Sequence, residues 1–212
     1  MTDSLRNQLD GPLDPYINEL TVPEANDESE EGKRLFFIGD TIKQYGVEYT
    51  LNDIHISDNI NELELDRTSF SSQKQLEANG DIEKGHKLVT LDVTIKNNSA
   101  GGYDPDGIHD KPNIFIENII GFKDDLEDPN GPFTIELSYF SEHPPYERDM
   151  WNDYYQFQLG HGEELEERLA WIVPSERLNE ESLYYINGSA NGPTGTEYWY
   201  FYQLSFEGEF FD

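Results

Sequence analysis

The sequence contains no cysteine. A disulfide framework, a thiol nucleophile and a cysteine-based metal site are therefore excluded. No apolar run approaches the length that crosses a membrane, and Met1 is not followed by the basic and apolar regions of a signal peptide. The chain as given is expected to be soluble. If the protein is exported, a signal or lipid-anchor segment precedes residue 1.

Basic side chains are scarce. The 212 residues include 14 Lys and Arg against 44 Asp and Glu, for a formal net charge of −30. A nucleic-acid partner is excluded, because phosphate binding needs clustered basic side chains and a polyanion would be repelled. The acidity suits high salt, a cation-rich cell wall, a basic partner or simply a well-solvated surface.

Recognisable catalytic motifs are also missing. The sequence has no Gly-x-Ser-x-Gly elbow, phosphate loop or dinucleotide fingerprint, and its five histidines form no His-Glu-x-x-His motif. We therefore expect a binding or accessory domain with no catalytic residue, rather than an enzyme. A hydrolase of wall polymers is kept as an alternative, since glycoside cleavage needs only two acids held across a cleft.

The clearest structural signal is the stretch at residues 85–99. Val89, Leu91, Val93 and Ile95 alternate with polar residues, which is the period-two pattern of a strand with one buried face. Glycine and asparagine on both sides supply turn chemistry. The rest of the chain is expected to pack around this strand.

Further strands are expected along the chain, which has a hydrophobic fraction of 35%. The segment 163–171 has both helix-forming residues and strand alternation, and we interpret it as a strand. Residues 58–80 are interpreted as a connection with a short strand or helical turn, and residues 141–153 as an irregular loop. The other candidates are a hairpin at 36–57 turning at Gly46, a hairpin of 113–122 and 133–140 turning at 128–131, and single strands at 154–159, 183–186 and 197–206.

The expected fold is all-β: an immunoglobulin-like antiparallel β-sandwich of eight or nine short strands. Residues 1–34 form an acidic tail with several prolines and no apolar period, which predicts a flexible or disordered linker. Residues 35–212 form the β-sandwich domain, since the apolar fraction is sufficient for one core.

The order of several motifs resembles a known family. They are Gly39-Asp40-Thr41, the hairpin with Gly46-Val47, the glycine-flanked strand ending in Asn97-Asn98-Ser99, and Leu159-Gly-His-Gly-Glu163 followed by Val173-Pro174. This arrangement resembles the telokin-like, immunoglobulin-fold domain of unknown function carried by secreted proteins and lipoproteins of Gram-positive bacteria and some archaea. The resemblance implies an extracellular, cell-surface domain behind an acidic linker. It carries no functional residue to this sequence, which also lacks the lipid-bearing cysteine.

One loop has residues suited to a hard cation. Asp104, Asp106 and Asp110 lie close together with His109, and carboxylate oxygens in such a loop are ligands for Ca²⁺. The spacing does not fit an EF-hand, because no acid stands at the twelfth position. Asp and Gly in this pattern also form ordinary surface turns, so the sequence leaves a turn and a calcium site as alternatives.

The strongest binding candidate is an aromatic strand near the end of the chain. Alternation places Tyr198, Tyr200 and Tyr202 on one face, which could form an exposed row that recognises a protein partner. Tyr146 and Trp151 would extend this surface. The alternative is a central strand covered on both faces, because large aromatic side chains are usually buried.

Overall fold

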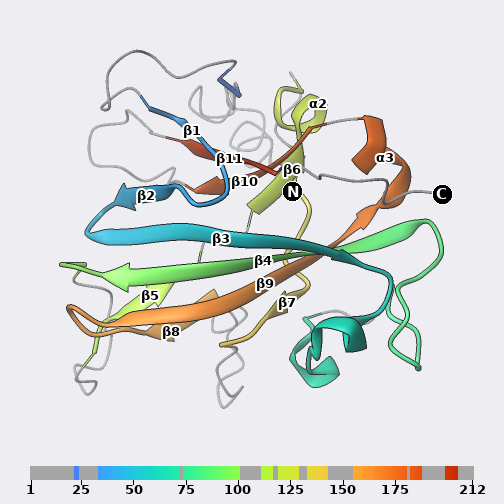
Figure 1. Cartoon of the computed structure of the whole chain (residues 1–212), viewed down its shortest axis with the longest axis horizontal. Helices are drawn as coiled ribbons and strands as arrows, with labels where there is room; N and C mark the ends of the chain where they lie inside the picture. Colours follow the sequence, from blue (N-terminus) through green and yellow to red (C-terminus); the bar gives the residue numbers. More distant parts are fainter. Residues whose placement is uncertain are drawn as a thin grey trace, which may run out of the picture.

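The computed structural model describes residues 22–23, 33–71, 74–100, 111–116, 119–128, 133–142, 155–180, 182–187 and 199–204. Figure 1 shows its strands in two sheets that pack face to face, with few and short helices. The described residues therefore form an all-β sandwich, as the sequence predicts.

The five-stranded sheet is built around the strand predicted at residues 85–99. Its strands, in order across the sheet, are β2 (Thr41–Gln44), β3 (Val47–Ser57), β4 (His86–Asn97), β9 (Glu164–Pro174) and β7 (Tyr139–Phe140), all antiparallel. The ambiguous segment 163–171 is strand β9, which pairs with β4 from Lys96↔Glu164 to His86↔Pro174. Pairing with a long central strand thus overrides the helix propensity of its glutamates.

The hairpin predicted at residues 36–57 is present as β2 and β3. Its two-residue turn is Tyr45-Gly46, with φ of 50° and 84°. Positive φ at both positions is the geometry of a type I′ turn, whose twist matches that of the flanking strands. A side chain at Gly46 would also meet the backbone of Ala100. Both the positive φ and this close contact therefore favour glycine at this position.

The four-stranded sheet contains β1 (Leu35–Phe36), β11 (Tyr200–Leu204), β10 (Leu183–Asn187) and β6 (Ile119–Phe122), in that order. The pairing of β1 with β11 is parallel, and the other pairings are antiparallel. A separate pair joins β5 (Asn113–Phe115) to β8 (Gln156–Gln158). The helical segments are η2 (Ile60–Leu63), η3 (Arg67–Ser69), α2 (Lys123–Leu126) and α3 (Ser175–Glu180).

The prediction that residues 113–122 and 133–140 form a hairpin is wrong. Its first arm is divided between β5 and β6, which lie in different sheets, and β7 pairs with β9. In the described parts of the two arms, only the bridge Ile120↔Ile135 joins them. Helix α2 begins directly after β6 and packs its Leu126 against Gly121, so the chain leaves the sheet where the hairpin was expected to continue. This division raises the strands in the described residues to eleven, above the eight or nine expected.

The main core lies between the two sheets. Its largest fully buried side chains include Phe122, Phe140, Trp171, Tyr185 and Tyr202. A smaller cluster covers one end of the outer face of the five-stranded sheet, where Ile60, Leu65, Phe70, Leu76 and Ile82 of the 58–82 connection pack on Leu88, Ala170 and Ile172. The same face is polar beyond this cover, and that boundary locates the candidate site.

A third cluster covers the outer face of the four-stranded sheet and includes Val22, Leu35 and Phe201. Val22 belongs to the predicted tail, and its backbone N–H donates to Glu127 Oε1 at 3.0 Å. This residue therefore packs on the domain. The other described tail residues are 23, 33 and 34, so the predicted flexibility of the tail lies outside the described residues.

Candidate functional site

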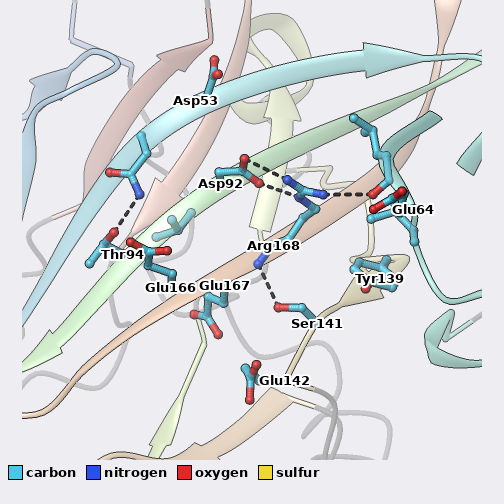
Figure 2. A pocket seen from close by; sticks show the side chains of 14 residues that line it. Asp53, Glu64, Asp92, Thr94, Tyr139, Ser141, Glu142, Glu166, Glu167 and Arg168 are labelled. Atoms are coloured by element: carbon cyan, nitrogen blue, oxygen red, sulfur yellow. Dashed lines mark hydrogen bonds and ion pairs between the residues drawn. The ribbon is translucent and has the colours of Figure 1, made fainter. Parts of the chain in front are cut away.

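A pocket of about 580 Å³ lies on the outer face of the five-stranded sheet, where the apolar cover of the 58–82 connection ends. Strands β3, β4 and β9 supply its floor, and the segments after η2 and after β7 supply its walls (Figure 2). The lining includes six acidic residues, which are Asp53, Glu64, Asp92, Glu142, Glu166 and Glu167. Arg168 is the single basic residue in the lining, so the pocket is strongly acidic.

An irregularity in β3 shapes one side of the pocket. The register between β3 and β4 shifts between Leu51 and Asp53, which places a β-bulge at Asn52. Asn52 and Asp53 are both exposed and both line the pocket, instead of pointing to opposite faces. Bulges are frequent beside functional sites because they redirect side chains in this way. Asn52 Nδ2 donates to Thr94 Oγ1 at 2.7 Å, which fixes its position.

Arg168, the only cation among the described lining residues, is already paired inside the pocket. Arg168 donates from Nε to Asp92 Oδ1 at 2.6 Å and from Nη2 to Asp92 Oδ2 at 3.1 Å. Its Nη1 donates to the carbonyl oxygen of Leu63 at 3.0 Å. This two-point contact is the strongest geometry for an arginine and a carboxylate. Arg168 is therefore not available to bind an anionic ligand.

Asp92 is held in its ionised form by the same contacts. Burial alone would raise the pKa of Asp92, but hydrogen bonding to Arg168 and to His55 outweighs burial and lowers it. His55 Nε2 lies 3.2 Å from Asp92 Oδ2 and 3.8 Å from Asp53 Oδ2. The pair of Asp92 and Arg168 thus forms a stable floor, with the remaining acids around it.

Three acids around the rim have no partner. Glu64, Glu142 and Glu166 are exposed, and their carboxylates make no hydrogen bond or ion pair within the part of the chain that the structure describes. Glu64 follows η2 with φ of 55°, a left-handed conformation that is uncommon for a residue other than glycine. Its backbone N–H donates to the carbonyl oxygens of Ile60 and Asn61 in η2, which fixes this residue at the pocket wall. The three carboxylates come from three separate segments and surround one opening.

Glu167 differs from the other acids because it is buried. It is 4% exposed, and neither carboxyl oxygen has a hydrogen-bond partner among the residues that the structure describes. Burial raises the pKa of Glu167 well above its usual value, and the nearby charge of Glu142 raises it further. The protonated form is therefore favoured far above the pH at which an exposed glutamate ionises.

The prediction of an exposed aromatic row on β11 is wrong for Tyr202. This side chain is fully buried, and its hydroxyl donates to the carbonyl oxygens of Tyr49 at 2.7 Å and of Asp40 at 3.0 Å. Tyr200 is half-buried against Phe36, with ring centroids 5.8 Å apart. Phe201 is fully buried on the opposite face. One face of β11 packs into the main core between the sheets and the other packs in the cluster with Val22 and Leu35, so both faces are covered and the alternative interpretation of the sequence holds.

The other predicted site residues lie outside the described residues. They are the partner-binding residues Tyr146, Trp151 and Tyr198 and the calcium ligands Asp104, Asp106 and Asp110. Within the described ranges, no group of three or more histidines or acids is arranged to hold a metal ion. The helices in those ranges are also too short to span a membrane.

The acidic pocket was not predicted from the sequence, although the sequence contains one signal for it. Val47, Tyr49 and Leu51 place apolar residues at odd positions of β3, whereas Ile54 and Ile56 place them at even positions. A change of phase within one strand indicates a bulge, and the bulge at Asn52 is where the pocket begins.

Comparisons with known proteins add a family and distant structural neighbours. A family model described as a domain of unknown function (DUF5027) matches residues 40–206. An uncharacterised β-sandwich protein from Clostridium difficile 630 has 13% identity and a TM-score of 0.45, covering 87% of this chain and all of that chain. The yjhA protein from Bacillus subtilis has 14% identity and a TM-score of 0.43, covering 80% of this chain and 99% of that chain. A search of curated proteins found no match.

Proposed function

The chain belongs to the family described as a domain of unknown function (DUF5027), and from its acidic pocket we propose that it is a binding module. The pocket recognises a positively charged segment of a protein partner, in which a lysine or arginine side chain enters among the unpaired acids. The function includes no catalytic step.

The observation that carries this proposal is the set of unpaired acids around one pocket. Glu64, Glu142 and Glu166 surround the opening, while Arg168 is engaged by Asp92 and by Leu63. Like charges around one cavity repel each other, and a cation placed among them relieves this repulsion. The net charge of −30 would in addition speed the approach of a basic partner.

The size of the pocket favours an organic cation over a bare metal ion. Its volume of about 580 Å³ falls within the range of pockets that hold organic ligands. Calcium needs six to eight oxygens at about 2.3–2.6 Å. The rim carboxylates come from separate segments, and the described residues contain no metal-type cluster. An ammonium or guanidinium group tolerates this looser arrangement.

We place the module outside the cell. The motifs around Gly39, Gly46 and Gly162 resemble the telokin-like domain of secreted proteins and lipoproteins, and this resemblance supports an extracellular position at the cell surface. Tyr146, Trp151 and Tyr198 stay predicted contacts with the same protein partner.

Binding of short synthetic peptides with two arginines would test the proposal. Titration calorimetry would compare the wild type with a triple variant at the rim, Glu64→Gln, Glu142→Gln and Glu166→Gln. A matched control changes three exposed acids elsewhere, at Glu77, Glu83 and Glu176. Each exposed pair contributes roughly 0.2–1 kcal/mol, so the rim variant should bind about 3- to 100-fold more weakly.

The control should change the affinity by less than about threefold, because it keeps the pocket intact while losing the same net charge. Equal losses in the two variants would contradict the proposal, since they would show attraction by net charge alone. Absence of any peptide binding to the wild type would also overturn it.

A further inference from the structure

We propose that the basic segment of the partner binds as an added β-strand along the edge of β9 at residues 164–167, beside the acidic pocket. This inference rests on the proposed function and adds the conformation and the residue pattern of the partner. The bound segment is extended and carries a lysine or arginine at every second position.

Strand β7 covers only part of the edge of β9. The two strands pair at two residues each, and Figure 1 shows how much shorter β7 is. The Arg168 N–H then donates to Ser141 Oγ at 2.9 Å, and the Ser141 N–H donates to the Arg168 carbonyl oxygen at 3.0 Å. The chain turns away at Ser141 and Glu142. In the described part of the chain, no strand therefore continues β7 along residues 164–167.

The backbone of this uncovered part has unpaired hydrogen-bonding groups. Arg168 turns its N–H and carbonyl toward β7, and β9 pairs with β4 from Glu164 to Pro174 without a shift of register. Alternate residues of an antiparallel strand turn these groups to the same side. Glu164 and Glu166 therefore turn theirs away from β4, to a side where the described residues provide no partner. Strand β8, which leads into β9, is hydrogen-bonded to β5 instead.

The side chains along this edge select a basic occupant. Glu164 and Glu166 are exposed and lie on the outer face of β9, and Glu142 lies beside them in the pocket lining. Directly opposite residues on neighbouring strands point to the same face. The two residues of an added strand opposite Glu164 and Glu166 are two positions apart, so lysine or arginine at both would pair with these acids. The residue between them faces the core side with the half-buried Leu165, where an uncharged side chain fits.

The same charges disfavour pairing between two copies of this chain. Two β9 edges brought together would place the glutamates of one copy against those of the other, and like charges in that position destabilise a sheet. A basic strand removes this repulsion. Its backbone hydrogen bonds to β9 then add to the side-chain contacts in the pocket.

Amide hydrogen exchange measured by NMR tests the pairing on the wild-type protein. The probe is a seven-residue synthetic peptide in which three arginines alternate with threonines. In the free protein the amides of Glu164 and Glu166 should exchange rapidly, whereas those of Leu165 and Glu167, which face β4, should exchange slowly. With free peptide at ten times its dissociation constant, exchange at Glu164 and Glu166 should slow by about tenfold, since only the unbound fraction stays open.

Single backbone N-methylation at each position of the peptide gives an independent measurement. The change removes one N–H and keeps the charge, so the affinity should fall at alternate positions only, by at least about twofold for each lost hydrogen bond. The positions between them are the matched controls. An equal response at every position would overturn the inference.

The results distinguish this inference from the proposed function. Peptide binding that leaves the Glu164 and Glu166 amides in rapid exchange would overturn the inference and leave the proposed function standing. Slow exchange of both amides in the free protein would also overturn it, because the edge would already be covered by the chain itself or by a second copy. Absence of any peptide binding would overturn both proposals.

Discussion

Replacing Glu167 with leucine is expected to stabilise the domain. In the wild type Glu167 is 4% exposed, and its carboxyl group has no hydrogen-bond partner within the described part of the chain; a buried polar group without a partner costs about 1–3 kcal/mol. Leucine has a similar size and would lie beside Leu165 and Leu169. We therefore expect Glu167→Leu to raise the free energy of unfolding by at least about 1 kcal/mol, even at low pH where the acid is protonated in both states.

The gain should increase with pH. The folded-state pKa of Glu167 is raised above its unfolded value, so its protonation favours the folded state below the unfolded pKa of about 4.3. That stability is lost as the pH rises from there toward the folded pKa, at up to about 1.36 kcal/mol per pH unit. The difference between variant and wild type isolates this residue from the other carboxylates of the chain.

Urea denaturation near pH 5 and near pH 7 measures both parts of this effect. Glu167→Gln is the matched control, because it removes the titration and keeps a buried polar group. The free energy of unfolding of Glu167→Gln should exceed that of the wild type increasingly as the pH rises. At low pH, however, it should not show the gain expected for Glu167→Leu. If Glu167→Leu destabilised the domain, or if its effect were the same at both pH values, the carboxyl group would have to be paired or exposed, and the reasoning would be refuted.

Three further predictions concern stability and can be measured by the same denaturation. Asp92→Asn should cost about 1–3 kcal/mol near pH 7, because it leaves the half-buried guanidinium of Arg168 without its anion. Since the pKa of Asp92 is lowered, this loss should fade as the pH falls below the usual aspartate pKa of about 3.9. Tyr202→Phe should cost about 1–3 kcal/mol because it removes the buried hydroxyl that donates to the carbonyl oxygens of Tyr49 and Asp40, and an unchanged stability would contradict the observed hydrogen bonds. Gly46→Ala should cost more than Gly39→Ala, because both have φ near +85° but only a side chain at Gly46 meets backbone atoms; equal costs would show that the contact is unimportant.

The sequence by itself determined the all-β class and most of the strands. Alternation is a local property, so Val89 to Ile95 predicts β4, and the turn residue Gly46 predicts the first hairpin. It also indicated that β11 carries aromatic side chains on both faces. Local patterns of this kind decide whether a segment is a strand and which of its residues share a face.

Only the tertiary structure decided which strands are neighbours and in what register. Asp92 faces Arg168 because β4 and β9 pair in one particular alignment, and Tyr202 is buried because its face of β11 packs into the main core between the two sheets. The predicted hairpin at 113–140 failed for the same reason, since β7 pairs with β9. Strand order and register depend on contacts between residues far apart in the chain, which local alternation does not contain. The acidic pocket is a product of those contacts, and so is the buried carboxyl group of Glu167.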